Sequence, residues 1–316
     1  MLQSGISVSI VTYNTWERTT TCIASIIDSH SDLQIEVLVH DNGSEPAPGA
    51  DWPDYVRIFK SPNNLGFGAG HNANLNLASY DTFLILNPDV SIDGAALISL
   101  SSALREDQTV GAAPLLIYPD GTEQLSVRRL PSARTELARM IGADRRPNSR
   151  WSTLVRVTPG IGPLEVEQPA AAVLAVRTET LRAIGGFDVA FPMYFEDVDL
   201  CARLRTKGRI VLLTDSQAIH DGEGTAKHYR TATTFWIENS RRRYHRKFAS
   251  GPIRPVILTA AWISVLTHFT ALTAKAWLRS GDERSMLFAK ARGYGLALVA
   301  TFAGSDDYWR RRFLKS

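Results

Sequence analysis

The sequence predicts an α/β fold: a mostly parallel, Rossmann-like sheet flanked by helices, followed by a helical C-terminal extension. Short runs of β-branched and apolar residues alternate with amphipathic segments over the first 90 residues, as in a parallel sheet whose strands are joined by helices. Polar residues directly follow several of these runs, where parallel sheets bind their ligands. From about residue 232 onward the pattern is helical.

The predicted strands and helices follow one another in chain order. Apolar, β-branched runs predict the strands, and amphipathic stripes predict the helices. Gly185 and Gly186 end one helix and Gly208 ends another, as glycine does at helix C-termini. We expect strands at residues 6–11, 35–39, 55–59, 82–86, 112–118, 173–176 and 210–213, and helices at 15–29, 69–78, 95–104, 179–184 and 197–207.

Composition narrows the classes of protein. The 316 residues are 44% hydrophobic and 21% charged, which suffices for a full core. The formal net charge of +3 is small, so we expect no nucleic-acid partner. Cys22 and Cys201 belong to no CxxC pair and are expected as buried thiols in a reducing compartment. The apolar run 6–11 is too short for a signal peptide, so a cytoplasmic location is expected. The oligomeric state stays open, a homo-oligomer included.

Several polar residues are placed to carry chemistry. Asp89 follows a strand and Pro88, where a carboxylate can hold a divalent cation; the alternative is a helix cap for the segment near Ile92. Gly66, Gly68 and Gly70 permit close backbone approach to a ligand, but their spacing differs from the dinucleotide fingerprint.

Three carboxylates, Glu196, Asp197 and Asp199, crowd the start of a predicted helix. Crowding raises carboxyl pKa values and suits a general base, although such residues also simply complement the helix dipole. His220 follows a predicted strand among glycines and is a candidate metal ligand; the alternative is a structural histidine.

These motifs occur in a recognisable order over residues 6–230. Together they resemble glycosyltransferase family 2, and within it the bacterial rhamnosyltransferase-like branch. The motifs are Thr12-Tyr-Asn14, Asp41-Asn-Gly-Ser44, the glycine-rich loop 64–72, Leu86-Asn-Pro-Asp-Val90, Gly185-Gly-Phe-Asp188, Phe195-Glu-Asp-Val-Asp-Leu200 and His220. One departure lies at residues 168–172, where the branch usually has a small Ser-Gly-Ala type loop beside the acceptor and this chain has Gln-Pro-Ala-Ala-Ala.

The resemblance implies a GT-A type catalytic domain at 1–230, with a donor half at about 1–120 and an acceptor half at about 121–230, before a helical extension at 231–316. It implies inversion at the anomeric carbon, Asp197 as catalytic base, Glu196 on the acceptor side, and Mg²⁺ or Mn²⁺ bound by Asp89 and His220. Thr225 and Lys227 lie where diphosphate contacts are expected. The implied donor-binding residues are Thr12, Asn14, Asp41, Asn64, Gly66, Asn72, Asn87 and Asp89.

The expected function is therefore transfer of a sugar from a nucleotide-diphosphate donor, with dTDP-rhamnose favoured by the branch. One alternative is a catalytically silent nucleotide-sugar-binding protein on the same fold. Another is a dinucleotide-dependent oxidoreductase, which the glycine spacing disfavours.

Basic clusters suggest the acceptor and the membrane. Residues 128–156 hold eight arginines against Glu136 and Asp144, an excess of six positive charges, and the default interpretation is a solvated surface. The alternative is a polyprenyl-diphosphate-linked glycan acceptor bound by Arg128 and Arg129. Three features favour an anionic membrane surface at the inner face of the plasma membrane: the basic run 241–247, the basic tail 309–315 and an amphipathic helix at 255–278. That helix packs on the domain, lies in the membrane interface or spans the bilayer, and its many polar residues argue against spanning.

Overall fold

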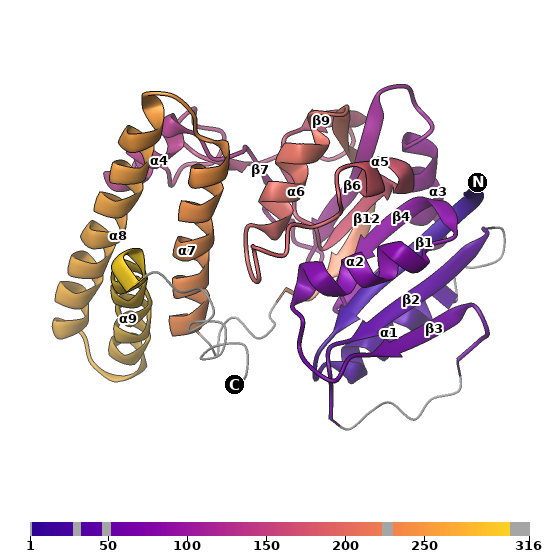
Figure 1. Cartoon of the computed structure of the whole chain (residues 1–316), viewed down its shortest axis with the longest axis horizontal. Coiled ribbons are helices and arrows are strands. Elements are labelled where there is room, and N and C mark those ends of the chain that lie inside the picture. Colours follow the sequence, from indigo (N-terminus) through magenta and orange to yellow (C-terminus); the bar gives the residue numbers. More distant parts are fainter. Residues whose placement is uncertain (1, 28–32, 46–51, 223–229, 304–316) are drawn as a thin grey trace. The chain divides into compact units, whose positions relative to one another are not determined.

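The chain forms two compact units. The computed structural model describes residues 2–27, 33–45, 52–222 and 230–303 (Figure 1). Unit 1 comprises Met1–Arg129, Val155–Ala190 and Glu196–Gly222, and unit 2 comprises Leu130–Leu154, Phe191–Phe195 and Glu223–Ser316.

Unit 1 is built on a mixed sheet of nine strands. Strands β1 to β4 are parallel where they pair, β6 and β12 are parallel, and β11 runs antiparallel between β4 and β6. All the strands predicted from apolar runs are present. The order across the sheet is β3 (Val56–Lys60), β2 (Ile35–Asp41), β1 (Gln3–Thr12), β4 (Tyr80–Leu86), β11 (Val173–Arg177), β6 (Thr109–Ile117), β12 (Arg209–His220) and β5 (Val90–Ser91), with β9 (Pro163–Val166) beside β12.

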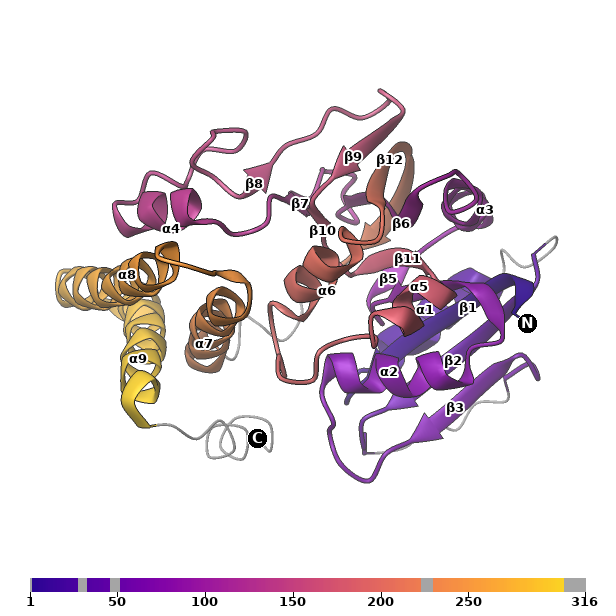
Figure 2. The same cartoon turned by 45° about the horizontal axis from the view of Figure 1, so that its top comes forward.

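Helices cover both faces of this sheet (Figures 1 and 2). Because successive strand residues point to opposite faces, β4 contributes Leu84 and Leu86 to one core and Phe83 and Ile85 to the other. The first core contains residues of α1 (Trp16–Ile27) and α3 (Gly94–Ala103). The second contains residues of α2 (Phe67–Leu77), α5 (Thr178–Ala183) and α6 (Glu196–Leu204), so all the helices predicted in this unit are confirmed.

Short elements between β6 and β11 escaped the sequence patterns. They are β7 (Val127–Arg128), α4 (Ala133–Met140), β8 (Leu154–Val155), β9 (Pro163–Val166) and β10 (Gln168–Pro169). The default interpretation of 128–156 as a solvated surface is wrong for α4, where Glu136 is 1% and Arg139 is 7% exposed. Their charges are buried because they pair inside unit 2: Arg139 bonds to the Glu238 carboxylate, and Glu136 lies 3.2 Å from Arg241.

Unit 2 is helical, as predicted for the C-terminal extension. It contains α4, α7 (Arg230–Phe248), α8 (Ile253–Trp277) and α9 (Gly281–Ala303), and the last three lie side by side in Figures 1 and 2. Phe235 and Trp236 of α7, Val265 of α8 and Ala297 of α9 form its small apolar core.

Helix α8 is the one helix in the described part of the chain that is long and apolar enough to cross a bilayer. It packs on α4 and α9, and its buried positions include the small residues Ala260, Ala261 and Ser264. The apolar side chains of Val256 and Trp262 remain 49% and 37% exposed. The helix therefore has both a packed face and exposed apolar residues.

Candidate active site

The ends of three strands bring the first predicted residues together. Thr12 at the end of β1 pairs in register with Asp41 at the end of β2, and Ile10 pairs with Leu86, which precedes Asn87. Because these strands are parallel, Thr12, Asp41 and Asn87 share the carboxyl edge of the sheet. Thr12 is 1% exposed, and its hydroxyl is hydrogen-bonded to that of Thr15, just before α1, and to that of Thr19 in α1.

The two carboxylate oxygens of Asp41 differ in their hydrogen bonding. The backbone N–H and the hydroxyl of Ser44 both donate to Asp41 Oδ1, at 2.9 and 2.6 Å. Asp41 Oδ2 is buried and has no hydrogen-bond partner among the described residues. An unsatisfied buried acceptor costs about 1–3 kcal/mol, so this atom is suited to receive a ligand N–H.

Asn14 holds the turn that carries Asp41. It adopts a left-handed conformation with φ of 53°, which asparagine tolerates better than most residues. Its N–H donates to Ser44 Oγ at 2.8 Å, and its Oδ1 accepts from the N–H of Glu45 at 3.1 Å. Asn14 therefore positions residues 41–45.

The glycine-rich loop is shaped mainly by its own side chains. Asn64 Oδ1 accepts from the N–H of Gly66, whose φ of 87° favours glycine, and Asn42 Oδ1 accepts from the N–H of Leu65. Gly70 serves packing instead, because a Cβ there would lie 2.8 Å from Val11. We expected all three glycines to permit close approach of a ligand, but at position 70 it is packing against Val11 that requires glycine. Asn42 belongs to the Asp41-Asn-Gly-Ser44 motif, but no role was predicted for it.

Asn72 connects α2 to the loop after α5. Its Nδ2 donates to the carbonyl of Phe187 and its Oδ1 accepts from the N–H of Phe187, both at 2.8 Å. Both amide groups are thus engaged with the backbone, and Asn72 fixes the position of residues 186–188.

Asp89 and His220 form the centre of a charged cluster. His220 Nε2 lies 3.3 Å from Asp89 Oδ1, because β12 and β5 pair His220 with Val90. Arg18 of α1 lies 3.8 Å from Asp89 and 2.9 Å from Asp221. Burial raises the pKa of Asp89, but the hydrogen bond and charge of His220, with Arg18, outweigh it and lower the pKa below its usual value. Asp89 is no helix cap, since Asp93 caps α3.

Gln124 fixes the orientation of the His220 ring. Its Nε2 donates to the backbone carbonyl of His220, which can only accept, so its Oε1 faces His220 Nδ1 at 2.9 Å. Nδ1 therefore carries a proton, and Nε2 faces Asp89 Oδ1 at 3.3 Å, so a proton or a cation must lie between these two atoms.

These residues fit a divalent cation. In the described part of the chain no group of three His, Cys, Asp or Glu side chains could hold a metal ion, so Asp89 and His220 would be two protein ligands. A hard cation such as Mg²⁺ keeps several positions for water and substrate phosphates, which suits such an open pair.

The three carboxylates at the start of α6 have different environments. Asp199 is fully buried and paired with Arg203 at 2.7 Å, so it is structural. Burial raises the pKa of Glu196 and of Asp197; the Asp197 charge adds to the effect on Glu196, while the Arg128 charge opposes it at Asp197. Tyr194 and Phe195, just before α6, have positive φ of 59° and 67°, a strain that often marks functional sites.

The atypical segment 168–172 holds Asp197. Gln168 Nε2 donates to Asp197 Oδ2 at 2.8 Å, and the Ala171 backbone N–H donates to the same carboxylate. One residue further on, the Ala172 carbonyl accepts from the Asn87 N–H at 2.8 Å. The segment therefore links Asp197 to the strand end that carries Asn87 and Asp89.

The remaining predicted residues are less constrained. Arg128 is exposed and Arg129 is half-buried, in and just after β7, which pairs with β10 at Gln168. Thr225, Lys227 and the tail 309–315 lie outside the described residues.

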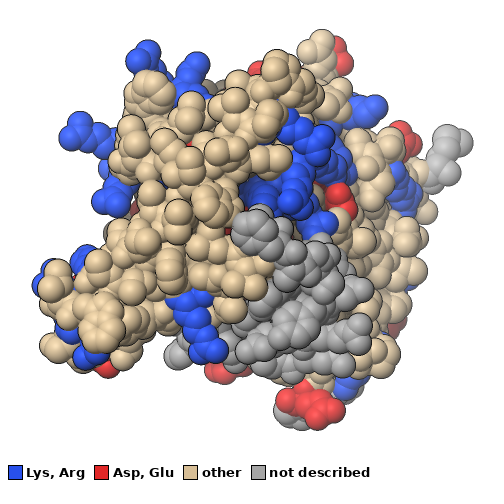
Figure 3. Space-filling view, turned by 60° about the vertical axis from the view of Figure 1, so that its left-hand side comes forward, with Lys and Arg blue, Asp and Glu red and all other residues tan. Residues whose placement is uncertain are grey.

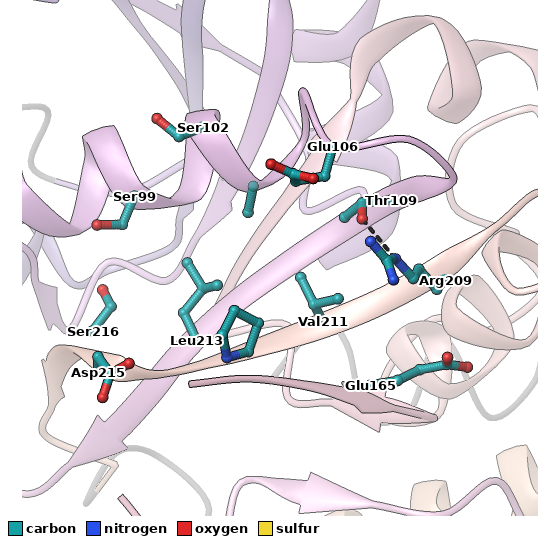
Figure 4. A pocket seen from close by; sticks show the side chains of 12 residues that line it. Ser99, Ser102, Glu106, Thr109, Glu165, Arg209, Val211, Leu213, Asp215 and Ser216 are labelled. Atoms are coloured by element: carbon teal, nitrogen blue, oxygen red, sulfur yellow. Dashed lines mark hydrogen bonds between the residues drawn. The ribbon is translucent and has the colours of Figure 1, made fainter. Parts of the chain in front are cut away.

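A separate pocket of about 460 Å³ lies between α3, β9 and β12 (Figure 4). Its rim carries Ser99, Glu106, Asp215 and Ser216, and Arg209 donates to Thr109. Its 12 lining residues include none of those predicted from the sequence, so it does not belong to this site.

Known proteins resemble both the sequence and the fold. Residues 7–161 match the model of "Glycosyl transferase family 2". The chain is 28% identical over 234 residues to N-acetylglucosaminyl-diphospho-decaprenol L-rhamnosyltransferase of Mycobacterium tuberculosis H37Rv, covering 68% of this chain and 75% of the relative. It is 26% identical over 192 residues to rhamnosyltransferase WbbL of Escherichia coli K12, covering 56% and 70%.

Solved structures show the same architecture. The mannosyltransferase PcManGT of Pyrobaculum calidifontis, in complex with GDP-Man and Mn²⁺, matches 96% of this chain and 89% of its own with a TM-score of 0.53 and 13% identity. GalNAc-T7 with UDP, GalNAc and Mn²⁺ matches 79% of this chain with a TM-score of 0.55 and 14% identity, and the match spans about half (52%) of that protein. The predicted GT-A type fold is confirmed.

Proposed function

Since this chain belongs to glycosyltransferase family 2 and is a glycosyltransferase, we propose that it transfers rhamnose from dTDP-rhamnose to a lipid-linked cell-surface glycan. Both curated relatives are named rhamnosyltransferases, which supports the sugar. The diphospho-decaprenol in the name of the mycobacterial relative supports a polyprenyl-diphosphate-linked acceptor.

The donor is proposed to bind at the carboxyl edge of the sheet. The vacant Asp41 Oδ2 suits the N–H of a pyrimidine base, which is a donor that a carboxylate can accept. Thr12 and Asn14 support this turn, and Asn64, Gly66 and Asn72 shape the loop on its other side. Asn87 and Asp89 would then face the diphosphate.

A divalent cation, Mg²⁺ or Mn²⁺, is proposed to be held by Asp89 Oδ1 and His220 Nε2. The Mn²⁺ named with both structural neighbours supports this choice. When bound, the cation supplies positive charge that stabilises the leaving diphosphate.

Asp197 is proposed to act as the general base of a single displacement. It accepts the proton of an acceptor hydroxyl, whose oxygen forms a bond to the anomeric carbon as the bond to the diphosphate oxygen breaks. The diphosphate leaves with the electron pair, and attack from the opposite face inverts the anomeric configuration. Glu196 Oε2, which is buried and has no partner among the described residues, is placed to orient the acceptor.

The proposal rests on the contacts of the segment 168–172, which hydrogen-bonds both to the Asp197 carboxylate and to the Asn87 N–H. The test is incubation of the chain with nucleotide sugars, Mg²⁺ or Mn²⁺, and a prenyl-diphosphate-linked glycan. We expect release of dTDP and an acceptor heavier by one rhamnose. Binding without release would instead favour a silent binding protein, and faster release from another sugar nucleotide would reassign the donor.

We also propose that the chain works at the inner face of the plasma membrane. The exposed apolar residues of α8 and the exposed Arg246 and Lys247 of the basic run 241–247 support attachment to an anionic surface, whereas Arg241 and His245 of that run pair with the buried Glu136. The division into a catalytic domain at 1–230 and an extension at 231–316 belongs to the same proposal.

A further inference from the structure

Unit 2 contains a small pocket of its own between α7, α8 and α9. Its volume is about 90 Å³. Arg241, Arg242 and Arg246 of α7 line it together with Glu238, so three positive charges meet one negative charge. Leu258 and Trp262 of α8 and Leu298 of α9 form the apolar part of its wall.

The acidic member of this pocket is compensated inside the unit. Glu238 pairs with Arg139, whose second nitrogen donates to Ser264 Oγ at 2.9 Å. Arg241 belongs to the same buried ion-pair network around α4, because it lies 3.2 Å from Glu136 and 3.9 Å from Glu238. The positive charges that remain in the lining of the pocket are therefore those of Arg242 and Arg246.

Arg242 is the arginine most suited to receive an anion. It donates to Asn239 Oδ1 at 2.6 Å, which fixes its guanidinium. Burial, with the charges of Arg246 and Arg243, lowers its pKa to about 10. Because burial and these neighbours both disfavour its positive charge, an anion in the pocket would offset them and gain charge-assisted hydrogen bonds.

The apolar wall indicates what the anion is joined to. The arginines and Trp262 line the same small cavity, so the charged group and an apolar chain must be adjacent. In a prenyl diphosphate the phosphate is bonded directly to the hydrocarbon, whereas in a phospholipid a glycerol with two esters separates them. Lys and Arg side chains are also prominent on the described surface in Figure 3, with few Asp and Glu among them.

We propose that this pocket binds the diphosphate end of a prenyl chain, with Arg242 and Arg246 on the phosphates and Trp262 and Leu298 against the first isoprene units. The inference rests on the proposed function in one respect, namely that the natural ligand is the lipid of the acceptor. The site itself is separate from the residues proposed for catalysis.

The test is titration of the full chain with farnesyl diphosphate, by calorimetry without donor sugar or divalent cation. Inorganic pyrophosphate, farnesol and phosphatidylglycerol vesicles are the comparison ligands. We expect farnesyl diphosphate to bind more tightly than pyrophosphate or farnesol. Arg242→Ala should weaken it about tenfold or more, as loss of a charge-assisted hydrogen bond predicts. Arg242→Lys, which keeps the charge, should weaken it less.

Two control variants make the result specific. Arg243→Ala removes the same charge from the next position of α7, which does not line the pocket, and should weaken binding much less than Arg242→Ala does. Asp89→Ala alters the proposed donor site and should leave the affinity unchanged. Circular dichroism and Tm identify any variant that fails to fold, in which case Arg242→Lys against Arg243→Lys decides.

Several results would overturn the inference. Equal weakening by Arg242→Ala and Arg243→Ala would mean general charge attraction, and loss of binding in Asp89→Ala would place the probe in the donor site. Equal competition by phosphatidylglycerol would assign the pocket to phospholipid headgroups. The titration contains no donor, so absence of binding here would not bear on the transfer assay of the proposed function. Conversely, if that assay identified a donor other than dTDP-rhamnose, we would still expect farnesyl diphosphate to bind.

Discussion

Replacing Asp197 by asparagine tests the proposed base most directly. Asparagine has nearly the same shape but accepts no proton at neutral pH. Loss of a general base costs roughly 10²- to 10⁴-fold in rate, so turnover should fall by that factor. Donor affinity should change little, because Asp197 belongs to α6, whereas the proposed donor residues belong to the ends of β1, β2 and β4 and to the loop 64–72.

The same substitution has a second, structural cost that can be derived from its contacts. Val198 N–H and Gln168 Nε2 donate to different oxygens of Asp197, both at 2.8 Å, so an NH₂ group at either position faces a donor. Rotation of the Gln168 amide would relieve the conflict but lose its bond to the Pro169 carbonyl. The net loss should be about 1 kcal/mol, seen as a decrease of roughly 3 °C in Tm.

The assay is single-turnover transfer measured from pH 4 to 9, alongside donor calorimetry and Tm. Because the pKa of Asp197 is raised and the base must be ionised, wild-type activity should fall as pH decreases through a value above the usual 3.8. The variant should lose this acid limb. Near-normal turnover in Asp197→Asn, together with a large loss in Glu196→Gln, would refute the assignment and make Glu196 the base.

The other predictions concern the cation pair and the buried charges of unit 2. Asp89→Ala, or chelator added to the unchanged chain, should abolish cation-dependent donor binding; turnover that survives exhaustive chelation would remove the cation from the mechanism. Gln124→Leu should weaken Mn²⁺ affinity about 10- to 100-fold, because the His220 ring loses its orienting partner, and an unchanged affinity would contradict this. Glu136→Gln should destabilise the protein above pH 4.5 and much less near pH 2. The reason is that folding lowers the pKa of Glu136 from 4.5 to about 2, so the ionised carboxylate contributes about 3 kcal/mol to stability. This contribution is lost as the pH falls from 4.5 to about 2. Thermal unfolding from pH 6 to 2 checks this, and parallel curves for both proteins would refute it.

The fold was largely predictable because its strands are buried on both sides. Runs such as 6–11 and 82–86 are apolar and β-branched, and residues with these properties form central strands. Strand β12 was predicted only at 210–213 but extends to His220. Its second half alternates buried and exposed residues and contains a register irregularity, so its polar residues masked the pattern.

The site was predictable where chain position alone determines geometry. Thr12, Asp41 and Asn87 follow parallel strands, so their proximity follows from the fold. Gln124 and Gln168 were missed because a glutamine has no chemical signature until its partner is known, and its partners lie 96 residues away in one case and 29 in the other. For the same reason, the departure at 168–172 gave no indication that it holds Asp197.

The arginine-rich stretch 128–156 combines residues with different roles that composition cannot separate. Arg139 is buried with Glu238, about 100 residues away in sequence, so its charge is part of the folded core of unit 2. Arg128 is exposed, and its charge acts on the carboxylate of Asp197 in unit 1. Neutralising the whole stretch would therefore destabilise unit 2 and also perturb the proposed base in unit 1. Only exposed positions can report on an anionic acceptor, and at Arg128 the measurement must separate loss of acceptor binding from the change in the pKa of Asp197.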